Sequence, residues 1–224
     1  DPKNAGGFLL WVAIADVAHY VTPGSPLDRS AVERGNSTYF PDRVVPMLPD
    51  VLSGDLCSLH EGVDRPCIAV EIKINAQGEK LDHNFHRGWM NSPAALSYEE
   101  AQSAIDGNPT ERAEPLIKPV LEPLFAAYEA LKIARKARAP LELDLPERKI
   151  VLSDMGKVTS IQFSDRFDAH KLIEEFMVLA NVCAAETLNQ KNQPLLFRNH
   201  EEPDQDKLEK LRETAASVGL KLAK

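Results

Sequence analysis

The sequence lacks three features that would each place it in a particular class of protein. No apolar run reaches the roughly 18 residues that a bilayer-spanning helix needs, and residues 1–7 have neither the basic nor the apolar segment of a secretory signal. Only three cysteines occur, Cys57, Cys67 and Cys183, without the short paired spacing of a zinc site. We therefore expect a cytoplasmic protein with reduced thiols, no membrane contact and no cysteine-bound metal.

Basic residues are also in short supply. The 26 lysines and arginines face 34 aspartates and glutamates, which gives a formal net charge of −8. Proteins that bind nucleic acid normally neutralise phosphates with a basic face, so the charge balance alone argues against such a ligand. A nucleic-acid ligand would require either lysines and arginines gathered locally in a narrow channel, or flanking domains that supply them.

The composition is otherwise that of an ordinary globular protein. With 224 residues, 43% hydrophobic and 27% charged, the chain can bury one substantial core or two small ones. We expect a single domain of the α+β class, with a mixed, mainly antiparallel sheet and packed helices.

Several segments have the patterns of strands. Residues 8–15 form an unbroken apolar run of strand length, which favours a buried central strand. Residues 66–75 alternate polar and apolar side chains, as in a half-buried strand, and residues 76–79 predict a hairpin turn into a second strand over 80–89. A second hairpin is expected from 147–152 and 157–163, and a short strand from 194–198.

Helices are predicted by capping residues and by apolar side chains at helical spacing. Ser25 and Pro26 indicate a helix through 27–34, and Ser97 with Glu100 has the spacing of a capping box that starts a helix ending near residue 106. A longer helix is expected over 113–136, although three prolines restrict its first part. The strongest pattern lies at 168–189, and an amphipathic helix at 204–218 is closed by Gly219.

Residues 36–49 cannot form an ordinary helix or a central strand, because three prolines fall within nine residues from Pro41. We expect a long, stiff and ordered loop, with the irregular segment continuing through 44–65. Ordered loops on a buried scaffold often carry binding and catalytic groups, so this loop is the first functional candidate.

The segments VAIADVAHYV, YFPDRVVPMLP and LCSL occur in this order and are followed by DAHKLIEEFMVLAN and FRNHEEPD. This order resembles the catalytic domain of the ribonuclease II and ribonuclease R family over nearly the whole chain. The resemblance implies a processive 3′-to-5′ exoribonuclease that hydrolyses RNA to 5′-nucleotides with two metal ions, and Mg²⁺ as the cofactor. It implies single-stranded RNA as the partner, and not DNA.

The resemblance also implies which residues bind RNA. Tyr39 matches the tyrosine that stacks on the last base at the 3′ end, although it could instead pack on the neighbouring prolines. Tyr98 and Glu174 match positions that contact ribose, while Leu143 falls where some members have a second aromatic ring of the base clamp. Arg43, close to Tyr39, could pair with a phosphate or with nearby acidic groups.

The residues that hold the metals are expected to lie outside the chain. The family supplies them from a D-x-D-D loop just before the strand that starts here at Phe8, and this motif does not occur in the sequence. The family's catalytic arginine lies beyond Lys224. Since the sequence also lacks an initiator methionine, we expect an excised and inactive part of a longer enzyme, whose catalytic residues are unknown and which holds no metal itself.

Other polar residues have weaker functional interpretations. Asp16 and His19, three apart, could act in acid–base or metal chemistry, but residues at the end of a buried strand usually tie down the following loop. His83 and His86 should face opposite sides of a strand, which disfavours a shared metal. Arg166, Lys171 and Arg198 are possible contacts for the RNA backbone.

Two further functions remain open. The chain could be a non-catalytic RNA-binding or scaffolding module, or a small-molecule hydrolase that uses Asp16 and His19.

Overall fold

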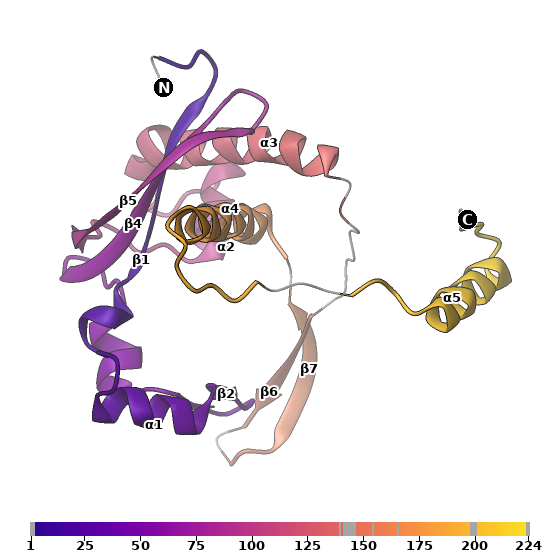
Figure 1. Cartoon of the computed structure of the whole chain (residues 1–224), viewed down its shortest axis with the longest axis horizontal. Coiled ribbons are helices and arrows are strands. Elements are labelled where there is room, and N and C mark those ends of the chain that lie inside the picture. Colours follow the sequence, from indigo (N-terminus) through magenta and orange to yellow (C-terminus); the bar gives the residue numbers. More distant parts are fainter. Residues whose placement is uncertain are drawn as a thin grey trace. The chain divides into compact units, whose positions relative to one another are not determined.

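The computed structural model describes residues 3–138, 140, 147–153, 155–164, 166–197 and 201–222. The chain divides into two compact units, Asp1–Ala184 and Ala185–Lys224. Helices and antiparallel strands follow one another along it (Figure 1), so the predicted α+β class is confirmed.

A three-stranded sheet supports the first unit. It consists of β1 (Phe8–Ala15), β4 (Asp64–Ile74) and β5 (Lys80–Asn91), paired antiparallel in the order β1-β4-β5. The prediction that residues 8–15 form the buried central strand is therefore wrong: in the described part of the chain β1 lies at the edge, and Leu9 and Trp11 are exposed. An apolar run shows that side chains favour leaving water, but it does not determine how many strands pair with it.

The hairpin between β4 and β5 confirms the predicted turn at residues 76–79. The side-chain oxygen of Asn75 accepts hydrogen bonds from the N–H groups of Gln77, at 3.0 Å, and Glu79, at 2.9 Å. Gly78 has a φ of 75°, a left-handed conformation that glycine adopts without steric cost. Local sequence therefore determines this turn, as the alternating pattern of residues 66–75 determines the face that β4 buries.

The main core lies between the sheet and two long helices, α3 (Glu122–Ala137) and α4 (Asp168–Gln190). Ile72 and Ile74 of β4 are fully buried there, and each contributes about 1.5–3 kcal/mol through burial. The other buried members of this cluster are Leu10, Val70, Ala127, Tyr128, Leu131, Leu172, Phe176 and Cys183. The helix predicted over 168–189 is confirmed by α4, whose apolar side chains complete this core.

A shorter helix and a broken helical segment form a second, smaller core. The helix α2 (Tyr98–Ile105) begins with the predicted capping box, in which Ser97 and Glu100 exchange hydrogen bonds. The helix expected over 113–136 is divided into η3 (Glu114–Leu116), η4 (Ile117–Leu121) and α3. Prolines lack the N–H that a regular helix needs, which explains the interruptions. Ala104, Ala113 and Leu121 are the buried residues here.

The segment between β1 and β4 contains the predicted helix and several shorter regular elements. It contains η1 (Val17–His19), α1 (Pro26–Arg34) and η2 (Val51–Leu56), and Ser25 and Pro26 start α1 as predicted. The predicted stiff loop contains a small antiparallel hairpin of two-residue strands, β2 (Thr38–Tyr39) and β3 (Val44–Val45). Strands this short can accommodate the surrounding prolines, because few backbone N–H groups have to bond.

The remaining elements are β6 (Glu147–Leu152) and β7 (Val158–Ser164), which pair as predicted, and α5 (Gln205–Ser217) in the second unit, where the helix at 204–218 was expected. The short strand predicted at 194–198 is wrong for residues 194–197, which have no regular structure, and Arg198 lies outside the described residues. Among the described residues, no helix combines the length and apolar character needed to cross a membrane.

Candidate RNA-binding site

Tyr39 lies on the β2–β3 hairpin with 77% of its surface exposed. It pairs with Val44 on the opposite strand, and the N–H of Phe40 donates to the carbonyl of Arg43 at 2.8 Å, which closes the turn. A side chain this exposed is not packed on the neighbouring prolines. The ring is therefore accessible to a ligand, and its stacking role stays a prediction.

The hairpin is braced from outside its two strands. Arg34, in the last turn of α1, donates to the carbonyl of Pro46 at 3.1 Å, and the Ser37 hydroxyl accepts from the N–H of Met47 at 2.9 Å. These bonds join the two arms of the hairpin and attach it to α1. The support of Tyr39 is consequently an ordered structure, as the proline-rich sequence predicts.

Arg43 shares the hairpin with Tyr39 and already has a partner. Its Nη1 lies 2.9 Å from the carboxylate of Asp42, and its guanidinium lies 5.3 Å from the centre of the Phe40 ring. Both members of the ion pair are well exposed, and such pairs stabilise a protein by no more than about 1 kcal/mol. A phosphate could therefore replace Asp42 at little cost, and phosphate binding remains a prediction.

Tyr98 is the first residue of α2 and is 41% exposed. Its ring stacks on the imidazole of His170, which lies in the first turn of α4. Beside it, backbone and Ser97 hydrogen bonds to the carboxylate lower the pKa of Glu99. Tyr98 thus joins the start of α2 to the first turn of α4, a contact that the sequence did not indicate.

Glu174 lies on α4 and is half exposed. It pairs with Arg166, and one of its oxygens lies 4.0 Å from Nη1 of Arg135 on α3. Arg166, a possible contact for the RNA backbone, pairs with this carboxylate in the structure. Glu174 therefore has an ordered position with arginines around it, and a ribose contact by it stays a prediction.

Glu175 differs sharply from the residue before it. Only 5% of its side chain is exposed, and it pairs with Arg135 and, at 3.2 Å, with Arg138. The carboxylate of Glu175 is thus both salt-bridged and buried. Arg135 and Arg138 are three apart on one helix face, a spacing that could have indicated a shared acidic partner.

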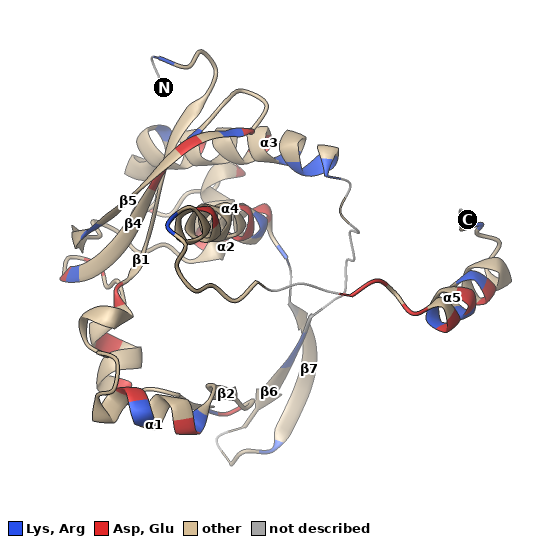
Figure 2. Cartoon of the chain, in the orientation of Figure 1, with Lys and Arg blue, Asp and Glu red and all other residues tan. Residues whose placement is uncertain are grey.

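One end of α3 carries basic side chains in an otherwise acidic chain. Figure 2 shows lysine and arginine at the C-terminal end of α3, where Arg135 and Lys136 occupy the last turn. Cations at a helix C-terminus also interact favourably with the partial negative charge there. The chain therefore has a positive end on one helix despite its net charge of −8.

The predicted site residues fall into two groups within the first unit. Tyr39 and Arg43 share the hairpin, while Tyr98 and Glu174 are connected to α4. Leu143 and Arg198 lie outside the described residues. Lys171 pairs with Asp168 at 3.5 Å on the surface of α4.

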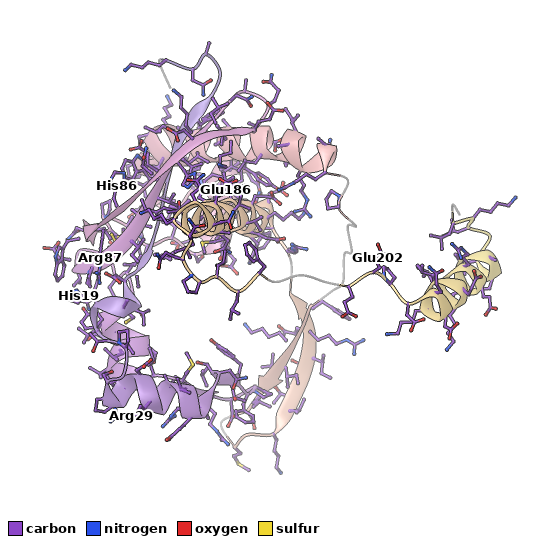
Figure 3. All side chains as sticks on the ribbon, viewed as in Figure 1. His19, Arg29, His86, Arg87, Glu186 and Glu202 are labelled. Atoms are coloured by element: carbon purple, nitrogen blue, oxygen red, sulfur yellow. The ribbon has the colours of Figure 1, made fainter. Side chains whose placement is uncertain are left out.

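Asp16, one member of the possible acid–base pair, is buried at the end of β1. Its carboxylate pairs with Arg87 of β5, which Figure 3 labels. One carboxylate oxygen, Oδ1, is buried without a hydrogen-bond partner in the structure. Burial raises the pKa of the Cys57 and Cys67 thiols, and the charge of Asp16 raises both further. The pairing of Asp16 with Arg87 indicates a structural ion pair that joins the end of β1 to β5.

The histidines lie apart from one another. His83 is opposite the buried Ile72 in the sheet, whereas His86 is opposite Ala69. The two histidines therefore face opposite sides, as expected, and the ring centre of His86 lies 5.2 Å from that of Trp11. His19 touches Trp89 edge-on at 5.8 Å. Within the part of the chain that the structure describes, no three His, Cys, Asp or Glu residues are grouped to hold a metal ion. The described donors therefore do not fit a two-metal centre.

Known proteins resemble this chain over almost its full length. It is 43% identical to ribonuclease R of Vibrio parahaemolyticus over 224 residues, which cover 99% of this chain and 27% of that protein. Ribonuclease R of Mycoplasma genitalium, solved with ribose-methylated single-stranded RNA, superposes with a TM-score of 0.88 at 31% identity, covering 94% of this chain and 33% of that one.

The same Mycoplasma genitalium enzyme has been solved with double-stranded RNA, again with a TM-score of 0.88 and 31% identity, over 95% of this chain and 38% of that one. The chain thus spans between about a quarter and two fifths of the length of these relatives. The RNB domain family matches residues 1–223. This match, together with the hairpin and helices described above, shows that the chain belongs to the RNB domain family.

Proposed function

We propose that this chain is part of a processive 3′-to-5′ exoribonuclease and that it binds the 3′ end of single-stranded RNA. The observation that carries the proposal is Tyr39, an exposed ring on a braced hairpin. Aromatic stacking on a base contributes about 1–3 kcal/mol and tolerates any sequence, because every base has a flat face. A rigid support keeps the ring oriented, so little entropy is lost when a base binds.

Ribose contacts would make the site specific for RNA. In the proposal Tyr98 and Glu174 hydrogen-bond the 2′-hydroxyl, which DNA lacks, and Arg43 pairs with a phosphate. Leu143 provides an apolar contact to the base. The ordered surroundings of Tyr98 and Glu174, and the likeness to a ribonuclease R solved with single-stranded RNA, support these assignments.

Hydrolysis to 5′-nucleotides is assigned to the longer enzyme. We propose that this chain forms one incomplete catalytic domain of that enzyme, which acts in the cytoplasm. In the proposal Mg²⁺ is held by residues of the enzyme that lie outside this chain. The ions would supply an activated water and stabilise the charge that develops on the phosphate. Because the described residues offer no fitting donor set, no chemical step is assigned to them.

Binding of RNA ends by the purified 224-residue chain tests the proposal. Fluorescence anisotropy would compare a labelled linear 12-mer of adenylate with the same RNA closed into a circle, and with the corresponding DNA, in EDTA and at low salt. We expect the linear RNA to bind more tightly than both. Equal affinity for linear and circular RNA would show that the site does not bind an end.

A further inference from the structure

The imidazole of His170 lies between the start of α4 and the start of α2. Its ring centre is 4.0 Å from that of Tyr98, with 23° between the planes, and 5.5 Å from that of Phe167, with 29°. Stacked, nearly parallel aromatic rings attract one another. Three aromatic rings from two helices and a connecting segment therefore form one stack.

His170 itself is held from the backbone. Its Nδ1 accepts a hydrogen bond from the N–H of Phe167 at 3.2 Å, which fixes the rotation of the imidazole. The N–H of Ala169 donates to the side-chain oxygen of Gln102 at 3.1 Å and thereby ties the first turn of α4 to α2. The imidazole is consequently a fixed surface for a ring that approaches from α2.

Tyr98 has its backbone fixed by the capping box, but its half-exposed side chain would otherwise have several rotamers. Contact with the flat face of His170 favours the rotamers that lay the phenol ring against it. Removing rotamer freedom before a ligand arrives increases affinity, because that entropy is not lost on binding. The hydroxyl of Tyr98 then has one preferred position.

We propose that His170 is a positioning residue for Tyr98, and that it contributes to the preference for ribose over deoxyribose by holding the phenol in place. The inference rests on the proposed ribose contact of Tyr98. His170 acts through stacking, so a residue with another flat ring can replace it, whereas an aliphatic side chain of similar size cannot.

The test measures the dissociation constants of the 224-residue chain for a labelled adenylate RNA 12-mer and its DNA counterpart in EDTA. We expect His170→Leu to lower the DNA-to-RNA ratio of these constants by about three- to tenfold. His170→Phe should keep the ratio within about twofold of the original chain. The matched control is His83→Ala, since His83 is also half-buried and in contact with a ring, that of Phe85, and should leave the ratio unchanged.

The outcomes separate this inference from the proposed function. If Tyr98→Phe lowers the ratio and His170→Leu does not, the positioning role is wrong while the ribose contact stands. If neither Tyr39→Ala nor Tyr98→Phe alters RNA binding, the proposed function itself fails. If His170→Leu and His170→Phe lower the DNA-to-RNA ratio equally, and both lower the thermal unfolding temperature, His170 has a purely structural role and the inference is overturned. The double variant Tyr98→Phe/His170→Leu should lower the DNA-to-RNA ratio no further than Tyr98→Phe alone.

Discussion

A β-carbon added to Gly78 would lie 2.1 Å from the carbonyl oxygen of Ala130, so the β4–β5 turn directly touches the backbone of α3. Gly78 also has a φ of 75°, where an L-amino acid with a side chain is strained. We expect Gly78→Ala to lower the free energy of unfolding by about 3 kcal/mol or more, because neither backbone can move aside cheaply. Urea denaturation measures this change.

Gly24 provides a matched control, since it has the same φ of 75° but no atom within 4 Å of an added β-carbon. Gly24→Ala should therefore cost only the backbone strain, about 1–2 kcal/mol. Equal costs at the two positions would contradict the close approach between the turn and α3.

The buried carboxylate of Glu175 should stabilise the join between α3 and α4. Glu175→Ala removes the partner of Arg135 and Arg138, and we expect a loss of about 2–3 kcal/mol in the free energy of unfolding. The loss stays below the cost of a fully buried unpaired charge, because both arginines reach solvent. The neighbouring Glu174→Ala should change stability by less than about 1 kcal/mol, since that side chain is exposed. A larger effect at Glu174 than at Glu175 would argue against the burial described here.

The half-buried thiol of Cys57 should react slowly at neutral pH. Burial and the charge of Asp16 raise its pKa above the ordinary value of 9.0, so less of the reactive thiolate is present at pH 8 than in an unfolded chain. The rate of reaction with a disulfide reagent should therefore keep rising above pH 9 in the native protein. The urea-unfolded chain is the control, and coinciding pH profiles for the two states would refute the raised pKa.

The isolated chain should show little or no nuclease activity. The donors needed for two-metal hydrolysis are proposed to lie outside it, so added Mg²⁺ should release no appreciable 5′-nucleotide from poly(A). Thin-layer or ion-exchange separation of the products measures this, with a full-length ribonuclease R as the positive control. Mg²⁺-dependent release by the purified chain would place catalytic donors within these residues.

Local signals in the sequence predicted much of the fold. Ser25 with Pro26, and Ser97 with Glu100, locate helix starts because capping depends on neighbouring residues, and the turn that contains Gly78 depends on Asn75. The edge position of β1 was not predictable, because strand order depends on pairing with distant residues. The prolines predicted a restricted first part of residues 113–136, but not where η3 and η4 end.

The candidate site divides in the same way. The exposure of Tyr39 follows from a proline-rich segment that cannot be buried as a regular element. The contacts of Tyr98 with His170, and of Glu175 with Arg135, join residues more than 35 positions apart, so a local pattern could not identify both partners of either contact. The resemblance to the ribonuclease family predicts which residues bind RNA, whereas the structure shows which neighbours hold Tyr39, Tyr98 and Glu174 in place.

The most direct test of RNA 3′-end binding is the affinity of Tyr39 variants for a single-stranded adenylate 12-mer, measured by anisotropy in EDTA. Tyr39→Phe keeps the ring and should bind within about twofold of the original chain, while Tyr39→Ala should bind about 5- to 100-fold more weakly. Trp11→Ala, which removes an exposed ring from β1, is the control and should leave the affinity unchanged. Unchanged affinity in Tyr39→Ala would contradict the central claim.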